Sequence, residues 1–142
     1  MTGVFYKKGS GQGFFHRQNW KRRAFQLTHT ELNYYDIDQA TKLRGTLDLT
    51  SCSLADLQVM PADCKKTGRS PATQWRVAIQ TPSRRFVFAA ETENEMQKLV
   101  QALQTIFEDN ERYLLHGDDD SLPRDNSFNY SNRYLERLSQ EC

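Results

Sequence analysis

The sequence is poor in cysteine and in long apolar runs. Its three cysteines, Cys52, Cys64 and Cys142, are odd in number and lack the close spacing of zinc ligands. We therefore expect neither a disulfide framework nor a structural metal, and a reducing compartment is the default. No apolar run approaches the length of about 18 residues that a membrane-spanning helix needs, and the first residues do not resemble a signal peptide. Any contact with a membrane is expected to be peripheral.

The sequence also lacks a recognisable catalytic constellation. The three histidines, His16, His29 and His116, are far apart, and no serine or cysteine lies in the context of a nucleophile. The acidic run at 118–120 is more typical of a solvated tail than of a metal site, because no further oxygen ligands follow at spaced positions. We therefore expect no enzyme, no cofactor and no bound metal.

Acidic residues are absent from the start of the chain. Met1 to Thr28 contains six lysines and arginines and no Asp or Glu, whereas residues 108–142 contain nine acids and four basic residues. The net charge of +1 therefore hides a basic front and an acidic tail. A run of like charges is usually a solvated face. The placement of these cations favours a binding surface instead, because they flank the glycine-rich segment 9–13, whose backbone can approach an anion closely.

Alternation of apolar and polar residues predicts seven short strands. They cover residues 3–8, 20–28, 31–37, 44–49, 53–60, 74–80 and 85–90. A helix is predicted after the last strand. Thr92 can cap it, acidic residues fill its first turn, and apolar residues recur at three- and four-residue steps from Met96 to Phe107. Hairpin spacing of this kind predicts one sandwich or barrel over residues 3–109, closed at one end by the helix. Residues 110–142 are expected to form an acidic, flexible extension.

The strand at 20–28 places cations beside apolar residues. At a two-residue period, Lys21 and Arg23 share a face with Phe25 and Leu27. If the apolar pair marks the core side, the two cations lie where the core ends, at the open end of the sheet. That end is where we expect a polyanion to be held.

Several motifs follow one another in the first third of the chain. They are Lys7, a glycine-containing loop, the run Trp20-Lys21-Arg22-Arg23-Ala24-Phe25-Gln26-Leu27, the pair Tyr34-Tyr35, and Lys42-Leu43-Arg44-Gly45 before an apolar strand. Together they resemble the front half of a pleckstrin homology (PH) domain, and the resemblance extends over residues 3–107. More narrowly, they are similar to the branch that binds inositol lipids phosphorylated at the 3-position. The general receptor for phosphoinositides is of this type, and Bruton's tyrosine kinase also has an extended first loop.

The resemblance implies a mainly β fold, a seven-stranded antiparallel sandwich or partly open barrel capped by one C-terminal α-helix. The family usually carries a tryptophan in that helix, and Leu99 takes its place here. The residues implied to hold the phosphates of an inositol headgroup are Lys7, Lys21, Arg23, Tyr34 and Arg44. Tyr34 has an alternative role as a rim aromatic with a solvated hydroxyl.

Further contacts with the ligand or the membrane are expected around these residues. The candidates are Lys8, Gly11, Phe14, Phe15, Arg17 and Lys42. Phe14 and Phe15 either insert into the membrane interface or fold back over the rim of the barrel. The cations of loop 61–73 are expected to be solvated, with contact to anionic lipid as the less favoured alternative.

We therefore expect a cytoplasmic module that binds phosphoinositides or inositol polyphosphates and recruits its parent protein to the inner leaflet of the plasma membrane. By resemblance, PtdIns(3,4,5)P3 is the preferred lipid, followed by PtdIns(3,4)P2. The alternative is a protein-interaction module on the same fold, with a peptide or small GTPase partner and weak, nonspecific binding of anionic lipid. The C-terminal extension could also bind a protein. Nucleic acid is not expected, because Trp20, Phe25 and Tyr35 look like core or rim residues rather than an exposed stacking row.

Overall fold

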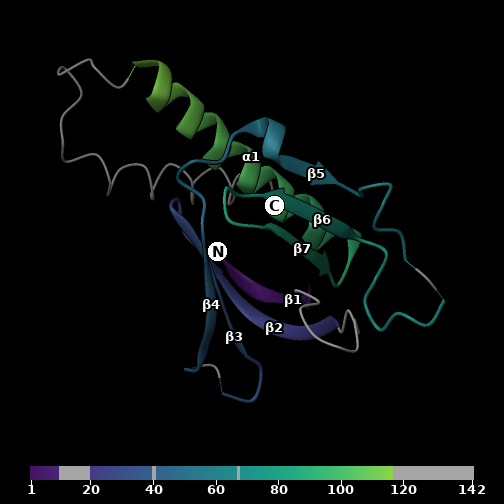
Figure 1. Cartoon of the computed structure of the whole chain (residues 1–142). Helices are drawn as coiled ribbons and strands as arrows, with labels where there is room; N and C mark the ends of the chain where they lie inside the picture. The colour runs from purple at the N-terminus through teal and green to yellow at the C-terminus, as the bar shows by residue number, and fades with distance from the viewer. Residues whose placement is uncertain (10–19, 40, 67, 117–142) are drawn as a thin grey trace.

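Seven strands and one long helix make up the fold of the computed structural model, which describes residues 1–9, 20–39, 41–66 and 68–116 (Figure 1). The strands are β1 (Thr2–Lys8), β2 (Trp20–Leu27), β3 (Glu31–Asp36), β4 (Leu43–Asp48), β5 (Leu57–Val59), β6 (Arg76–Gln80) and β7 (Arg85–Ala90). A short 3-10 helix, η1 (Leu54–Asp56), precedes β5, and the helix α1 (Glu93–His116) follows β7.

The strands form a single antiparallel sheet in the order β4-β3-β2-β1-β7-β6-β5. The sheet curves around a core, and α1 packs against β5, β6, β7 and η1 (Figure 1). The predicted fold class, seven antiparallel strands with a C-terminal helix, is confirmed. Six of the predicted strands agree with the structure to within two residues at each end.

The fifth predicted strand is wrong over most of its length. The segment 53–60 begins with a turn, because the Asp56 carboxylate accepts a hydrogen bond from the Ser53 backbone N–H at 2.9 Å and the Asp56 N–H bonds back to the Ser53 carbonyl at 3.0 Å. This local pairing winds the chain into η1. Only three residues, Leu57 to Val59, then pair with β6.

Aromatic rings from three strands fill the middle of the core. The Phe5 ring lies 4.9 Å from the Phe25 ring and 5.0 Å from the Phe88 ring, measured between centroids. The apolar stripe of α1 packs onto the same cluster, and Leu99, at the place where the family usually has a tryptophan, is 2 % exposed. Burying an aliphatic or aromatic side chain of this kind contributes about 1.5–3 kcal/mol, so α1 is a core element of the domain.

The helix α1 is longer than the sequence predicts. Beyond Phe107 its apolar stripe ends, but polar contacts hold it to residues 49–54, between β4 and β5, as far as Glu111. The Asn110 amide donates to the carbonyls of Leu49 and Cys52 at 2.7 and 3.1 Å, and the Glu111 carboxylate accepts from the Leu54 N–H at 2.9 Å. The predicted boundary between residues 109 and 110 therefore falls inside the helix. No helix within the described ranges is long and apolar enough to cross a bilayer.

Candidate functional site

The inner face of the sheet changes from aromatic to cationic at one end. In the pairing of β1 with β2, Phe5 lies opposite Arg23 and Lys7 lies opposite Lys21. In the pairing of β2 with β3, Phe25 lies opposite Tyr34 and Arg23 lies opposite Asp36. The cations therefore continue the rows that Phe5 and Phe25 begin, in the position expected from the two-residue period.

Arg23 and Arg44 meet at the carboxylate of Asp36. The Arg23 guanidinium forms an ion pair with Asp36 Oδ1, and Arg44 binds both carboxylate oxygens, through Nε at 2.8 Å and Nη2 at 2.7 Å. Hydrogen bonding from Arg44 holds the pKa of Asp36 below its ordinary value, and the charges of Arg44, Arg23 and Lys42 act in the same direction against the opposing effect of desolvation. Two of the predicted ligand residues are thus brought together by an acid that was not predicted to take part.

A β-bulge in the sheet directs the Arg44 side chain toward Asp36. The register between β3 and β4 shifts between Tyr34, which pairs with Gly45, and Tyr35, which pairs with Leu43. Arg44 is therefore the extra residue of a bulge, and a bulge turns its side chain away from the regular alternation.

Lys7 lies over two aromatic rings on the same face. Its Nζ is 5.1 Å from the centre of the Tyr34 ring and 5.6 Å from that of Phe86. Burial lowers the pKa of Lys7, and the charges of Arg84 and Arg23 lower it further, while Tyr34 opposes them. Lys7 is therefore a partly desolvated cation close to other cations, and a bound anion would stabilise its charged form.

Arg84 joins this group from the turn between β6 and β7, and the sequence did not identify it. Its Nη2 lies 3.5 Å from the Tyr34 hydroxyl, and its guanidinium carbon is 5.5 Å from the centre of the Phe86 ring. Lys7 pairs with Phe88 across β1 and β7, so the start of β7 continues past the end of β1. Only that pairing of distant segments brings Arg84 to the site. A small cavity of about 50 Å³ lies between Lys7, Arg84 and Phe86.

The Tyr34 side chain lines the site and is also part of the hydrophobic core. Its side chain is only 6 % exposed, and its ring packs 5.6 Å from that of Phe86. Its expected alternative as a solvated rim residue is therefore wrong. The hydroxyl lies against Gly45, where an added Cβ would be 2.2 Å from the oxygen, so this position of β4 has room for glycine alone.

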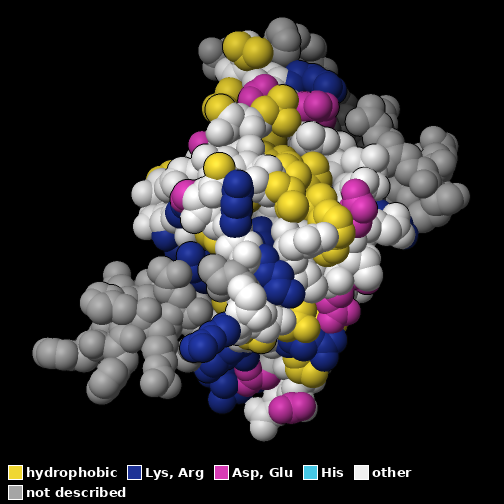
Figure 2. Space-filling model, turned by 90° about the vertical axis from the view of Figure 1, so that its right-hand side faces the viewer, with side chains coloured by type: hydrophobic (Ala, Val, Ile, Leu, Met, Phe, Trp, Pro, Cys, Tyr) yellow, Lys and Arg dark blue, Asp and Glu magenta, His cyan; other side chains and the backbone are white. Residues whose placement is uncertain are grey.

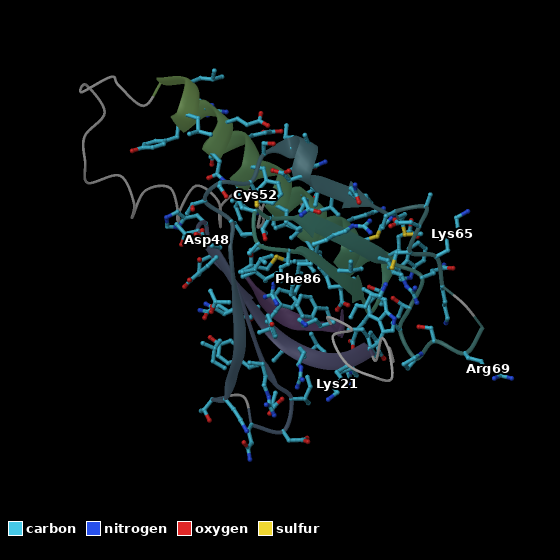
Figure 3. The ribbon with its side chains drawn as sticks, in the orientation of Figure 1. Lys21, Asp48, Cys52, Lys65, Arg69 and Phe86 are labelled. Atoms are coloured by element: carbon cyan, nitrogen blue, oxygen red, sulfur yellow. The ribbon has the colours of Figure 1, made fainter. Side chains whose placement is uncertain are left out.

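Lys8 and Lys21 line a second, larger hollow on the neighbouring side. This cleft of about 660 Å³ is bounded by the start of β2 and the loop before β6, and its lining also includes Trp20, Asp63, Cys64, Lys65, Arg69, Ser70, Pro71 and Arg76. Lys21, Lys65 and Arg69 lie on the side of the molecule away from Asp48 and Cys52 (Figure 3). Lysine and arginine side chains gather on the lower half of the face that Figure 2 presents.

The floor of this cleft is held by a buried arginine. Arg76 is 4 % exposed and donates to the carbonyls of Thr73 and Lys65 at 3.1 and 3.0 Å and to the Ser70 hydroxyl at 2.8 Å, while its guanidinium lies 4.5 Å from the centre of the Trp20 ring. Arg76 therefore fixes the base of the loop that carries Lys65 and Arg69.

The remaining predicted contacts have different outcomes. Lys42 is exposed and lies near enough to Asp36 to influence its pKa. Gly11, Phe14, Phe15 and Arg17 lie outside the described residues. Among the residues that the structure does describe, no group of three or more metal-ligating side chains is close enough to hold an ion.

A curved sheet closed by one helix, with cations at its open end, is the architecture of a PH domain. The PH domain family model matches residues 1–107, and the chain belongs to this family. PH domains bind phosphoinositides, inositol phosphates or proteins, and they are generally non-catalytic modules.

Known relatives agree with this assignment. The chain is 32% identical over 93 residues to Protein daughter of sevenless from Drosophila melanogaster, a match that covers 61% of this chain and 10% of that protein, so the chain spans about a tenth of this relative's length. Among solved structures, it is similar to the PH domain of human TBC1 domain family member 2, with a TM-score of 0.55, 25% identity, and coverage of 87% of this chain and 91% of that one. The C-terminal PH domain of pleckstrin in complex with D-myo-Ins(1,2,3,5,6)P5 has the same fold, with a TM-score of 0.52 at 22% identity over 75% of this chain and 92% of that one.

Proposed function

We propose that this PH domain binds the headgroup of polyphosphorylated inositol lipids and recruits its parent protein from the cytoplasm to the inner leaflet of the plasma membrane. One observation carries the proposal: Lys7, Arg23, Arg44 and Arg84 come from four separate segments and surround the Tyr34 ring and the Asp36 carboxylate. Four cations against one carboxylate leave a net charge of +3 at one end of the barrel.

The chemistry of these groups suits phosphate monoesters. Arginine presents a planar fork of donors that matches a phosphate, and lysine adds a point charge. A phosphate monoester carries a charge of about −1.5 to −2 at neutral pH, so a headgroup with several of them can replace the solvation that these cations lose. By resemblance we favour PtdIns(3,4,5)P3, then PtdIns(3,4)P2, over PtdIns(4,5)P2. The inositol pentakisphosphate bound to the C-terminal PH domain of pleckstrin supports a ligand of this class on this fold.

The cations of the second cleft add attraction to an anionic leaflet. Lys8, Lys21, Lys65 and Arg69 lie at the same end of the domain, and Asp63, the acid among the cleft-lining residues, is paired with Arg85 at 2.5 Å. Each lysine or arginine near an anionic surface contributes roughly 1 kcal/mol. This attraction assists recruitment but does not select one lipid among several.

Calorimetry with inositol 1,3,4,5-tetrakisphosphate, the soluble headgroup of PtdIns(3,4,5)P3, tests the proposal. We expect Arg23→Ala to abolish specific binding and to leave the thermal unfolding temperature nearly unchanged. The matched control is Arg112→Ala, because Arg112 is an exposed arginine on α1 that forms an ion pair with Asp109 of the same helix at 3.7 Å. Undiminished affinity of Arg23→Ala would refute the site.

A protein-binding function is the second candidate, and a separate observation favours it. Near the end of α1, the side chains of Tyr113, Leu114 and Leu115 are 69–80 % exposed, and Val59 and Met60 are exposed at and just beyond β5. Exposed apolar side chains are typical of surfaces that bind other proteins. Sedimentation with vesicles that each carry one phosphoinositide separates the candidates: equal, salt-sensitive binding to every anionic vesicle would favour the protein-binding function.

A further inference from the structure

The position that an incoming phosphate would take between Arg23 and Arg44 is already held by an anion of the chain itself. Asp36 binds Arg44 through both oxygens and shares one of them with Arg23. The side chains of Arg23 and Asp36 are each 17% exposed, whereas that of Arg44 is 42% exposed. The pair on the Arg23 side is therefore the more shielded from solvent, and a ligand meets Arg44 first.

The guanidinium groups are only partly free to bind another anion. Arg44 uses Nε and Nη2 on the carboxylate, and Arg23 uses Nη1. A phosphate that binds through either arginine fork must therefore displace the carboxylate or come to lie beside it. In both cases the negative charge of Asp36 opposes the negative charge of the ligand.

We propose, on the basis of the function proposed above, that Asp36 is an internal competitor that restricts the site to ligands carrying several phosphate monoesters. A phosphodiester, as in a lipid with one phosphate in its headgroup linkage, carries the same single charge as the carboxylate. Its exchange for Asp36 leaves the two arginines no better neutralised. A phosphate monoester carries about twice that charge, so its exchange is favourable.

The surroundings of Asp36 are consistent with competition by charge. The groups that act on the carboxylate are Arg44, Arg23 and Lys42, all cationic, and together they hold its pKa below the ordinary value. Asp36 therefore stays ionised at neutral pH, and release of the arginines requires another anion. Lys7 and Arg84 stand outside the ion pairs of Asp36 and are free to attract the ligand at distance.

The opposite role is physically distinct. Asp36 could hold the two arginines in the orientation that a phosphate needs, and its removal would then weaken binding. A competitor and a positioning residue predict changes of affinity in opposite directions, so the sign of the effect decides between them.

The test compares Asp36→Asn with Asp48→Asn in the whole chain. Both substitutions change the net charge by one, but the Asp48 carboxylate accepts its hydrogen bonds from Thr50, away from the arginines. Affinities are measured by calorimetry for inositol 1,3,4,5-tetrakisphosphate and for inorganic tripolyphosphate. Sedimentation is measured with vesicles of phosphatidylcholine containing phosphatidylserine. Thermal unfolding of each variant verifies that it is folded, and Asp36→Glu, which retains the charge, provides a second variant.

Three results support the competitor role. Asp36→Asn should bind both soluble polyanions about tenfold more tightly than the wild type, because a charged hydrogen-bond partner of the arginines has been removed. It should also bind the phosphatidylserine vesicles more strongly than the wild type does. Asp48→Asn and Asp36→Glu should behave like the wild type.

The remaining results overturn one proposal or the other. Equal or weaker binding by Asp36→Asn overturns the competitor role. In another outcome, Asp36→Asn binds tripolyphosphate more tightly, while both it and the wild type bind the inositol headgroup no more tightly than tripolyphosphate. That result leaves Asp36 as a competitor but overturns the lipid function. Absence of binding of either polyanion to all variants overturns both. An equal gain in Asp48→Asn shows an effect of net charge alone and also overturns the competitor role.

Discussion

Gly45→Ala is the substitution whose cost the structure specifies most directly. An added Cβ would lie 2.2 Å from the Tyr34 hydroxyl oxygen and 2.4 Å from the ring carbon that carries it. Both distances are far below van der Waals contact, and Tyr34 is 6 % exposed with its ring against Phe86, so the ring has little room to move. Overpacking of this kind costs about 1–3 kcal/mol, which lowers the unfolding temperature by about 4–8 °C per kcal/mol in a domain of about 100 residues.

Urea unfolding followed by tryptophan fluorescence measures this loss, and Gly68→Ala is the control because an added Cβ there meets nothing within 4 Å. A double-mutant cycle with Tyr34→Ala identifies the cause. In the Tyr34→Ala background, Gly45→Ala should cost little, because the clashing ring is absent. If Gly45→Ala is as stable as Gly68→Ala, or if its cost persists without the Tyr34 ring, the close packing of these two residues is not what requires glycine.

Three further outcomes follow from the packing and the buried groups. Asn110→Ala should lower the free energy of unfolding by about 1–3 kcal/mol, because the Cys52 carbonyl loses the donor that this amide supplies and the Leu49 carbonyl keeps only the Cys52 N–H, and chemical denaturation checks this. Arg76→Leu should cost about 3 kcal/mol, measured the same way, since three partly buried acceptors lose a charged donor. Burial raises the pKa of the Cys52 thiol to about 11. The stability that this thiol contributes is therefore complete below the unfolded pKa, near 8.5, and is lost as pH rises toward 11, and Cys52→Ala should show a shallower loss in alkaline unfolding curves.

Periodicity was sufficient to predict most of the fold. The face shared by Lys21, Arg23, Phe25 and Leu27 follows from local alternation, and the apolar stripe of α1 follows from its three- and four-residue steps. These features depend on residues near one another in the chain. The shortened β5 depends on the hydrogen bonds between Ser53 and Asp56, which compete with strand formation and give no signal in the apolar pattern.

The composition of the site was harder to predict, because it depends on pairing between distant segments. Arg84 reaches Tyr34 through the pairing of β1 with β7, and periodicity within either strand gives no register between them. Asp36 follows Tyr34 by two residues on β3, but its pairing with a second arginine requires the bulge that redirects Arg44. Lys21 was predicted to bind the headgroup with Lys7 and lies opposite it across β1 and β2, yet it lines the neighbouring cleft, because side chains at a strand end can turn toward either hollow.

The helix α1 also sets where the described part of the chain ends relative to the basic site. It rises about 1.5 Å per residue and continues to His116, beyond Glu111, whose carboxylate accepts a hydrogen bond from the Leu54 N–H. Figure 1 shows its C-terminal end projecting away from the end of β1, the start of β2 and the loop before β6. A bilayer docked at that basic side of the domain would leave the C-terminal end of α1 in the aqueous phase.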